Sequence, residues 1–169
     1  MKKDLRLYNV IFPIWILWAL PPFIIVCGVG NLIVDAAVIL ITARFLKIKV
    51  TALCIFKAWG LGFAADFIGA GFLYAISSLL YFLGTDYKGL AYLNDSIRIS
   101  VDYDPFANFY ALLITIAAIA ISGICIYFFN KKIGFKKTEI TEGQKTVVSL
   151  TMAIVTSPYM FLIPGKLFF

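Results

Sequence analysis

The feature that most constrains this chain is an apolar run of 37 residues over 10–46, in which Asp35 and Arg44 carry the only charges. One helix of that length extends about 55 Å, nearly twice the hydrocarbon core of a bilayer, which is about 30 Å thick. The run is therefore expected to fold back on itself. The segment 28–31 contains two glycines and an asparagine, and we predict the turn there.

The composition extends this reasoning to the whole chain. Hydrophobic residues make up 62% and charged residues 14%, whereas soluble domains are about half apolar and a quarter charged. We predict an all-α integral membrane protein, a compact bundle of about five transmembrane helices within limits of four to six. Residues 1–169 form a single membrane domain, and its predicted spans are the apolar runs 8–27, 30–46, 55–83, 107–129 and 146–165.

Basic residues are distributed unevenly among the connections. Twelve of the fifteen lie before the first run, around the junction of the second and third runs (44–57), or in the loop 130–145. With five spans all twelve face one side, and the loop 84–106 with its four aspartates faces the other. The positive-inside rule then predicts a multi-pass protein of the cell membrane, with the N-terminus cytoplasmic and the C-terminus outside. A six-span alternative, which divides the third run at 65–66, places the basic loop outside and is disfavoured.

Prolines predict breaks in the first and last runs. Pro21 and Pro22 lack amide donors and clash with the preceding turn, so the first helix is expected to break near them. Pro158 is expected to bend the outer half of the last helix. Before that helix, Thr141 and Gln144 fit a capping box.

The third run combines small residues with a carboxylate, Asp66. Small side chains allow two membrane helices to approach closely, and this helix is expected to be the central one of the bundle. The predicted helix-packing residues are the glycines on either side of the carboxylate: Gly60, Gly62, Gly69 and Gly71.

Two carboxylates within apolar runs require an explanation. An ionised Asp at the centre of a membrane helix costs about 2.5–3.5 kcal/mol on insertion scales, so Asp35 and Asp66 need partners, water or a proton. One interpretation is structural: Asp35 bonds Asn31, one turn earlier, or a Ser or Thr side chain of another helix, and Asp66 pairs with Arg44 or Lys57. The other is functional, and it places Asp66, Asp35 and Asn31 along a polar path for a cation.

The turn predicted at 28–31 also sets the depth of each carboxylate. Asp35 then lies about 6–8 Å below the outer surface, whereas Asp66, nine residues after Lys57, lies about 14 Å from the inner surface. We therefore expect the two carboxylates to be offset along the membrane normal rather than aligned as a pair.

The sequence lacks the residues that several kinds of catalytic or metal-binding site require. The chain has no histidine, and Cys27, Cys54 and Cys125 are widely spaced, so neither a metal site nor a cofactor is predicted. Intramembrane aspartyl proteases carry a GxGD motif, but here three residues separate Gly62 from Asp66. An enzyme is not expected, although an intramembrane one stays open as a third alternative.

The expected partner of the basic residues is the lipid bilayer, and not nucleic acid, because these residues flank the spans. The sequence favours a small transport-type protein, or a transporter subunit, that handles a cation or a cation-coupled solute around Asp66. The alternative is a non-catalytic scaffold, assembly or regulatory subunit that binds another membrane protein or a second copy of itself.

Overall fold

The computed structural model describes residues 23–86, 91–136 and 138–165, and the regular structure in these residues is entirely helical. Four helices within the described ranges are long and apolar enough to cross a membrane. They are α2 (Phe23–Leu46), α3 (Ala52–Asp86), α5 (Phe109–Phe129) continued by the turn η2 (Asn130–Gly134), and α6 (Glu142–Val155) followed by the short helix η3 (Tyr159–Leu162).

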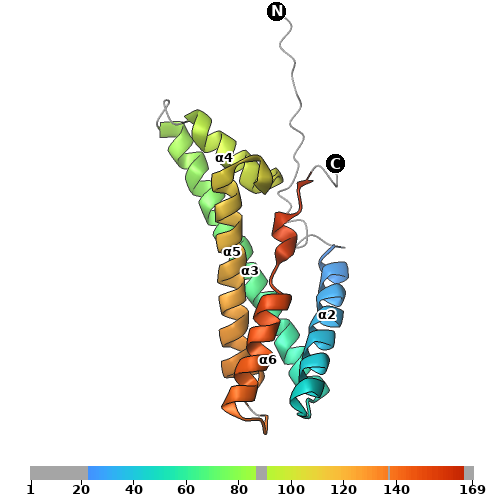
Figure 1. Cartoon of the computed structure of the whole chain (residues 1–169). Helices are drawn as coiled ribbons and strands as arrows, with labels where there is room; N and C mark the ends of the chain where they lie inside the picture. The colour runs from blue at the N-terminus through green and yellow to red at the C-terminus, as the bar shows by residue number, and fades with distance from the viewer. Residues whose placement is uncertain (1–22, 87–90, 137, 166–169) are drawn as a thin grey trace, which may run out of the picture.

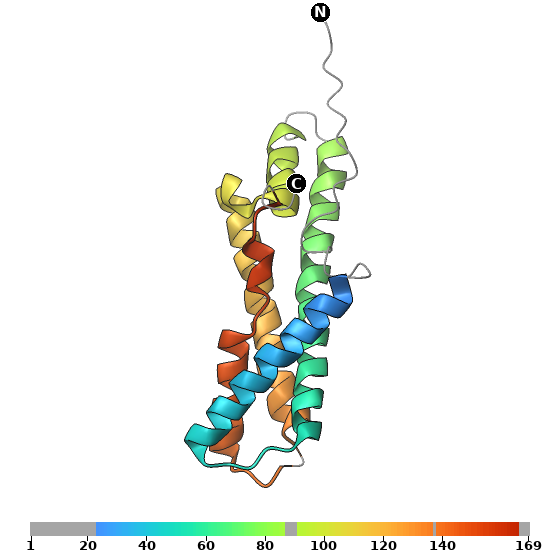
Figure 2. The ribbon, with the colours of Figure 1, turned by 90° about the vertical axis from the view of Figure 1, so that its right-hand side faces the viewer.

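The helix α3 is the centre of the arrangement and packs against α2, α4 and α5. The four long helices run alternately up and down, and α2 crosses α3 obliquely while also contacting α6 (Figures 1 and 2). Between α3 and α5 the chain forms a shorter helix, α4 (Ala91–Tyr103), and the turn η1 (Pro105–Ala107). The described parts of the segment 84–106 are thus largely helical, and α4 packs on α3 and α5.

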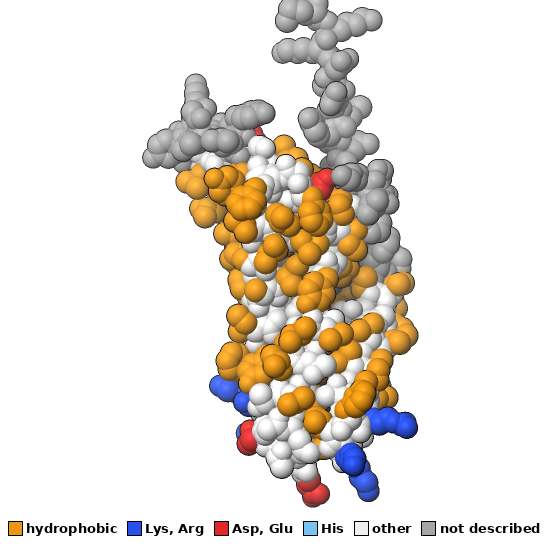
Figure 3. All heavy atoms as spheres, viewed as in Figure 1, with side chains coloured by type: hydrophobic (Ala, Val, Ile, Leu, Met, Phe, Trp, Pro, Cys, Tyr) orange, Lys and Arg blue, Asp and Glu red, His pale blue; other side chains and the backbone are white. Residues whose placement is uncertain are grey.

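Apolar side chains cover the middle of the outer surface, as Figure 3 shows for one face. Large residues within the long helices, such as Ile33, Tyr74 and Ile116, are exposed, a pattern typical of a surface that contacts lipid. The α2–α3 and α5–α6 connections lie together at one end, which we call the basic end. Its described cations are Arg44, Lys47, Lys49, Lys57, Lys131, Lys132, Lys136 and Lys145.

The turn predicted at 28–31 is wrong, because α2 is helical from Phe23 to Leu46. The indole Nε1 of Trp59 donates a hydrogen bond to the carbonyl oxygen of Gly28 at 2.9 Å, and a Cβ at Gly28 would lie 3.8 Å from the Trp59 ring. This segment is therefore packed against α3 rather than bent. Pro21 and Pro22, predicted to break a helix, lie outside the described residues, as does most of the first predicted span.

The third helix is unbroken through residues 65–66, so the alternative that divides it there is wrong. In contrast, the last apolar run contains a real interruption. The helix α6 ends at Val155, residues 156–158 are not helical, and η3 begins at Tyr159, so Pro158 lies at the bend.

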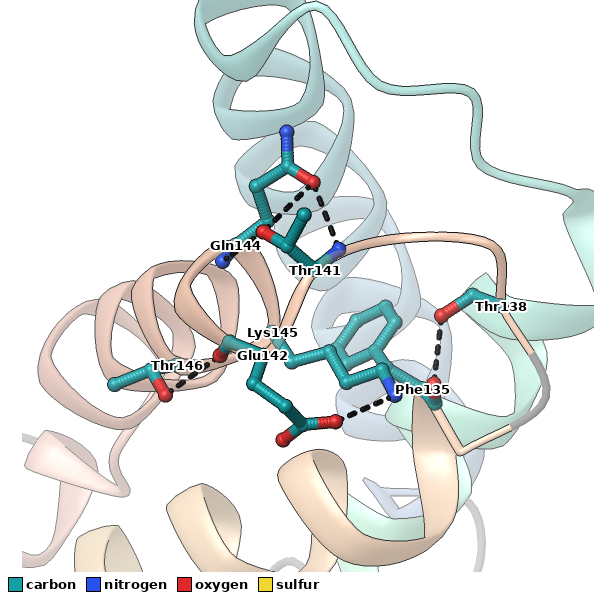
Figure 4. A network of polar contacts seen from close by, with 7 residues as sticks. All are labelled: Phe135, Thr138, Thr141, Glu142, Gln144, Lys145 and Thr146. Atoms are coloured by element: carbon teal, nitrogen blue, oxygen red, sulfur yellow. Dashed lines mark hydrogen bonds and ion pairs between the residues drawn. The ribbon is translucent and has the colours of Figure 1, made fainter.

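Helix caps stabilise the ends of α2 and α6 at the basic end. The predicted capping box is confirmed: the Gln144 side chain accepts from the Thr141 amide at 2.9 Å, and the Thr141 hydroxyl accepts from the Gln144 amide at 3.3 Å (Figure 4). The Gln144 side-chain amide also donates to the Leu46 carbonyl at 3.5 Å, which joins α6 to the end of α2. Lys47, with φ 53°, closes α2 in a Schellman motif, since the amide of Ile48 donates to the carbonyl of Ala43 at 3.0 Å.

Candidate functional site

The continuous course of α2 places Asp35 in the middle of the helix. Because α2 does not bend at 28–31, Asp35 lies twelve residues after Phe23 and eleven before Leu46. Its side chain is 4% exposed. The expectation that it lies near the outer surface is therefore wrong.

Asp66 lies on the central helix α3 and faces α2. The side-chain amide of Asn31 donates to Oδ2 of Asp66 at 3.5 Å, across 35 residues of sequence. Asp66 is 8% exposed, and its second oxygen, Oδ1, is buried and has no hydrogen-bond partner among the described residues. A buried acceptor without a donor is costly and calls for an explanation.

Asp35 joins the same cluster. Its Oδ2 lies 3.5 Å from the position that a Cβ at Gly62 would occupy, so the carboxylate packs directly on the α3 backbone. Both carboxylates lie in the interface between α2 and α3. Asp35 faces Gly62, one turn before Asp66, and Asp66 faces Asn31, one turn before Asp35, so the two aspartates do not lie directly opposite each other. The expected offset along the membrane normal stays a prediction, and we call these two buried aspartates the acid pair.

Thr156, the residue that follows α6, also faces this interface; the sequence predicted a Ser or Thr of another helix as a partner of Asp35 without indicating which one. The Thr156 side chain lies against the Asp35 carboxylate, and its hydroxyl donates to the Met152 carbonyl at 2.9 Å. Thr156 is the first residue after α6, at the interruption before η3. Its position immediately before Ser157-Pro158 is the only sequence signal that could have indicated it.

The acid pair has no cationic partner among the described residues. Neither aspartate forms an ion pair there, and the expected partners Arg44 and Lys57 are exposed. Arg44 is nine residues from Asp35 along α2, and Lys57 is nine residues from Asp66 along α3. Each separation is about 14 Å along the helix axis. The expected pairing of Asp66 with Arg44 or Lys57 is not present in the structure.

A third buried aspartate, Asp102, differs from the acid pair in its partners. Asp102 on α4 is 6% exposed, and the Ser77 hydroxyl lies 3.0 and 3.2 Å from its two oxygens. An Arg98 nitrogen lies 3.7 Å from Oδ2 of Asp102. Asp102 therefore has a counter-charge, whereas the acid pair has none in the described part of the chain.

The four predicted packing glycines have two different environments. Gly62 contacts Asp35, and Gly69 lies so close to α5 that an added Cβ would be 2.1 Å from Oγ of Ser122. Gly60 and Gly71 have nothing within 4 Å of an added Cβ and lie on the exposed side of α3. Only the first two face a neighbouring helix within the described residues.

Two cavities lie away from the acid pair. A groove of about 520 Å³ between α5 and α6 is lined mainly by apolar side chains, including Ile116, Ile124 and Leu150. A cavity of about 550 Å³ at the basic end lies between the α2–α3 connection and the start of α6, and Lys47 and Lys49 line it. Neither is lined by Asp35 or Asp66.

In the described ranges, no three Cys, Asp or Glu side chains are grouped as metal ligands. Comparisons with protein-family models, with curated proteins and with solved structures gave no match to this chain. The geometry of the acid pair is therefore the basis for the functional argument.

Proposed function

We propose that this chain is a small transport-type protein, or a subunit of one, that handles a cation or a cation-coupled solute. The observation that carries the proposal is the Oδ1 atom of Asp66, which is buried and lacks a donor among the described residues, in the same α2–α3 interface as a second buried carboxylate, Asp35. Intramembrane acids that face the interior of a bundle typically belong to ion pathways and proton relays. A cation bound there would supply the missing partner.

The position of the interruption after α6 supports this proposal. Thr156 contacts Asp35, and Phe161 of η3 lies 3.2 Å from the position of a Cβ at Gly69 on α3. The acid pair is thus in contact with the one non-helical segment inside a candidate span of the described chain, residues 156–158. Interrupted helices beside a binding site are a common feature of transporters.

The orientation follows from the basic end. Its lysines and arginine lie at one end of the bundle, and we propose that this end faces the cytoplasm of the cell membrane, with the C-terminus outside. The count of five spans depends on residues 8–22, which lie outside the described ranges, and stays a prediction.

The test is cation uptake into proteoliposomes that contain the purified protein. Uptake of protons is read with an internal pH dye and uptake of sodium with a radioactive tracer, each under an imposed membrane potential. We expect the wild-type protein to take up one of the two, Asp66→Asn to lose at least nine-tenths of that rate, and the exposed control Asp95→Asn to retain it. Equal rates for Asp66→Asn and wild type would refute the proposal.

A second candidate function, that of a membrane scaffold or regulatory subunit, is favoured by one observation. Gly60 and Ala64, and then Gly71 and Ala75, are exposed small residues four apart on one face of α3. Such pairs allow another helix to approach closely. If this face binds a partner, Gly60→Leu and Gly71→Leu will remove a co-purifying membrane protein or a second copy without changing cation uptake.

A further inference from the structure

We infer that the cavity at the basic end binds the phosphate group of an anionic phospholipid. This inference goes beyond the proposed function, because neither aspartate of the acid pair lines this cavity. It does not depend on the transport of a cation.

The cavity is enclosed by segments that are far apart in the sequence. Its volume of about 550 Å³ falls within the range of small-ligand pockets, about 300–1,000 Å³. In Figure 4 the side chains of Thr138 and Gln144 extend from the wall formed by the α5–α6 connection and the start of α6. The residues of the lining that could meet a polar ligand include Lys47, Lys49, Thr51, Thr138, Glu139 and Gln144.

Positive charge exceeds negative charge around the cavity. Lys47 and Lys49 are exposed, and neither forms an ion pair among the described residues. Glu139 also lines the cavity and forms no ion pair in those ranges, so the described lining has a net charge of +1. An ammonium group donates up to three hydrogen bonds, and phosphate oxygens are strong acceptors for it. Two such groups beside one cavity favour an anion with several acceptor oxygens.

The backbone conformation of Lys47 indicates a role for its side chain. Its φ of 53° lies in the left-handed region, at the position after a helix where glycine is usual. The capping bond there joins the backbone groups of Ala43 and Ile48 and makes no use of the lysine side chain. Residues held in such conformations are concentrated at binding sites. What lysine adds to this position is a cation at the edge of the cavity.

Helix ends add to the positive potential. The helix α3 begins directly after Thr51, and α6 begins two residues before Gln144. The N-terminal end of a helix carries a partial positive charge that favours anions. The C-terminal end of α2 borders the same cavity, but its carbonyls at Ala43 and Leu46 already accept hydrogen bonds.

The position of the cavity favours a lipid over a soluble anion. Lysine and arginine side chains of the basic end lie where the apolar surface ends, as Figure 3 shows for one face. Phe45, two residues before Lys47, is 83% exposed, and Leu53, directly before Cys54 of the lining, is 63% exposed. A phosphate bound by the lysines would therefore place its acyl chains near apolar side chains that are open to lipid. Basic pockets between membrane helices are known to bind anionic headgroups.

The test is native mass spectrometry of the full chain in detergent micelles, titrated with dioleoylphosphatidylglycerol. Dioleoylphosphatidylcholine has the same acyl chains and no net charge, and serves as the control lipid. We expect the wild-type protein to bind phosphatidylglycerol about tenfold more tightly than phosphatidylcholine. Equal affinities for the two lipids would overturn the inference without the need for any variant.

Variants distinguish a site from general surface charge. Lys47→Gly and Lys49→Gln should each weaken phosphatidylglycerol binding about fivefold and leave phosphatidylcholine binding unchanged. Glu139→Gln should strengthen phosphatidylglycerol binding. Lys57→Gln, a matched control at an exposed lysine that does not line the cavity, should change it by less than about twofold. An equal loss in Lys57→Gln and Lys47→Gly would indicate diffuse attraction to the basic end and would refute the site.

Lys47→Gly also separates binding from folding. Glycine adopts positive φ without strain, so this variant removes the cation while it relieves the backbone. Weaker lipid binding by a protein with a higher unfolding midpoint therefore supports the inference. Unchanged lipid binding by that variant contradicts it.

A soluble-phosphate arm separates the two sources of the same chemistry. Phosphorus NMR of inorganic phosphate with the lipid-free protein should show no line broadening, because phosphate lacks the acyl chains. Broadening that Lys47→Gly abolishes would assign the cavity to a soluble anion and overturn the lipid assignment. Asp66→Asn should lose cation uptake and bind phosphatidylglycerol as the wild type does, so failure of the proposed function and failure of this inference are distinguishable.

Discussion

The substitution Gly69→Ala tests the packing that holds the central helix against α5. An added Cβ would lie 2.1 Å from Oγ of Ser122, 3.1 Å from the carbonyl oxygen of Ala118 and 3.2 Å from Cε2 of Phe161. The serine hydroxyl cannot simply turn away, because it donates a buried hydrogen bond to the Ala65 carbonyl at 3.1 Å. The variant must therefore move a helix or break that bond.

The expected magnitude follows from these contacts. Overpacking of a closely packed site costs about 1–3 kcal/mol, and loss of a buried hydrogen bond adds about 1 kcal/mol. Replacing a helical glycine by alanine stabilises the helix by about 0.5–1 kcal/mol, which offsets part of this cost. Gly69→Ala should thus lower the free energy of unfolding by about 1–3 kcal/mol. Gly71→Ala, with open space at its Cβ, should raise it by about 0.5–1 kcal/mol.

The assay is reversible unfolding of the purified protein in mixed micelles, with both variants measured beside wild type. We expect Gly69→Ala to be the less stable of the two, and addition of Ser122→Ala to recover part of its loss by removing the closest atom. If Gly69→Ala were as stable as Gly71→Ala, the close approach of α3 and α5 would be refuted.

Three further changes have defined outcomes. Lys47→Gly should raise the free energy of unfolding by about 1 kcal/mol, because glycine adopts positive φ without strain; a lower unfolding midpoint would contradict the Schellman motif. Thr141→Ala should lower it by about 1 kcal/mol through loss of the helix cap, and an unchanged midpoint would count against the capping box. Arg98→Gln should leave Asp102 without its counter-charge and accelerate hydrogen exchange in α4 relative to α5; equal exchange in wild type and variant would show that this ion pair does not hold α4 in place.

The polar residues of the site could be identified from the sequence. Their position together in the α2–α3 interface could not. Asp66, Asp35 and Asn31 are conspicuous because they interrupt apolar runs, and that contrast is visible without a structure. Whether Asp35 lies near the surface or at mid-helix depends on where α2 begins. The contact that decides it, between Trp59 and Gly28, is a tertiary interaction that no local turn propensity reports.

The sequence also did not predict which residues of each helix face a neighbouring helix. The central helix is apolar around its whole circumference, so periodicity does not distinguish Gly62 and Gly69, which face neighbours, from Gly60 and Gly71, which do not. Thr156 was missed because a threonine in an apolar run usually bonds the preceding turn, as this one also does. The helical fold itself follows directly from the hydropathy of the chain.

The central claim is that Asp35 and Asp66 act as one site, and a double-mutant cycle of cation uptake tests it most directly. Proteoliposomes with wild type, Asp35→Asn, Asp66→Asn and the double variant are compared at matched protein content. If the two carboxyl groups form one site, the double variant should be no slower than the slower single variant. If the two losses in rate instead multiply, the aspartates act independently and the acid pair is not the functional unit.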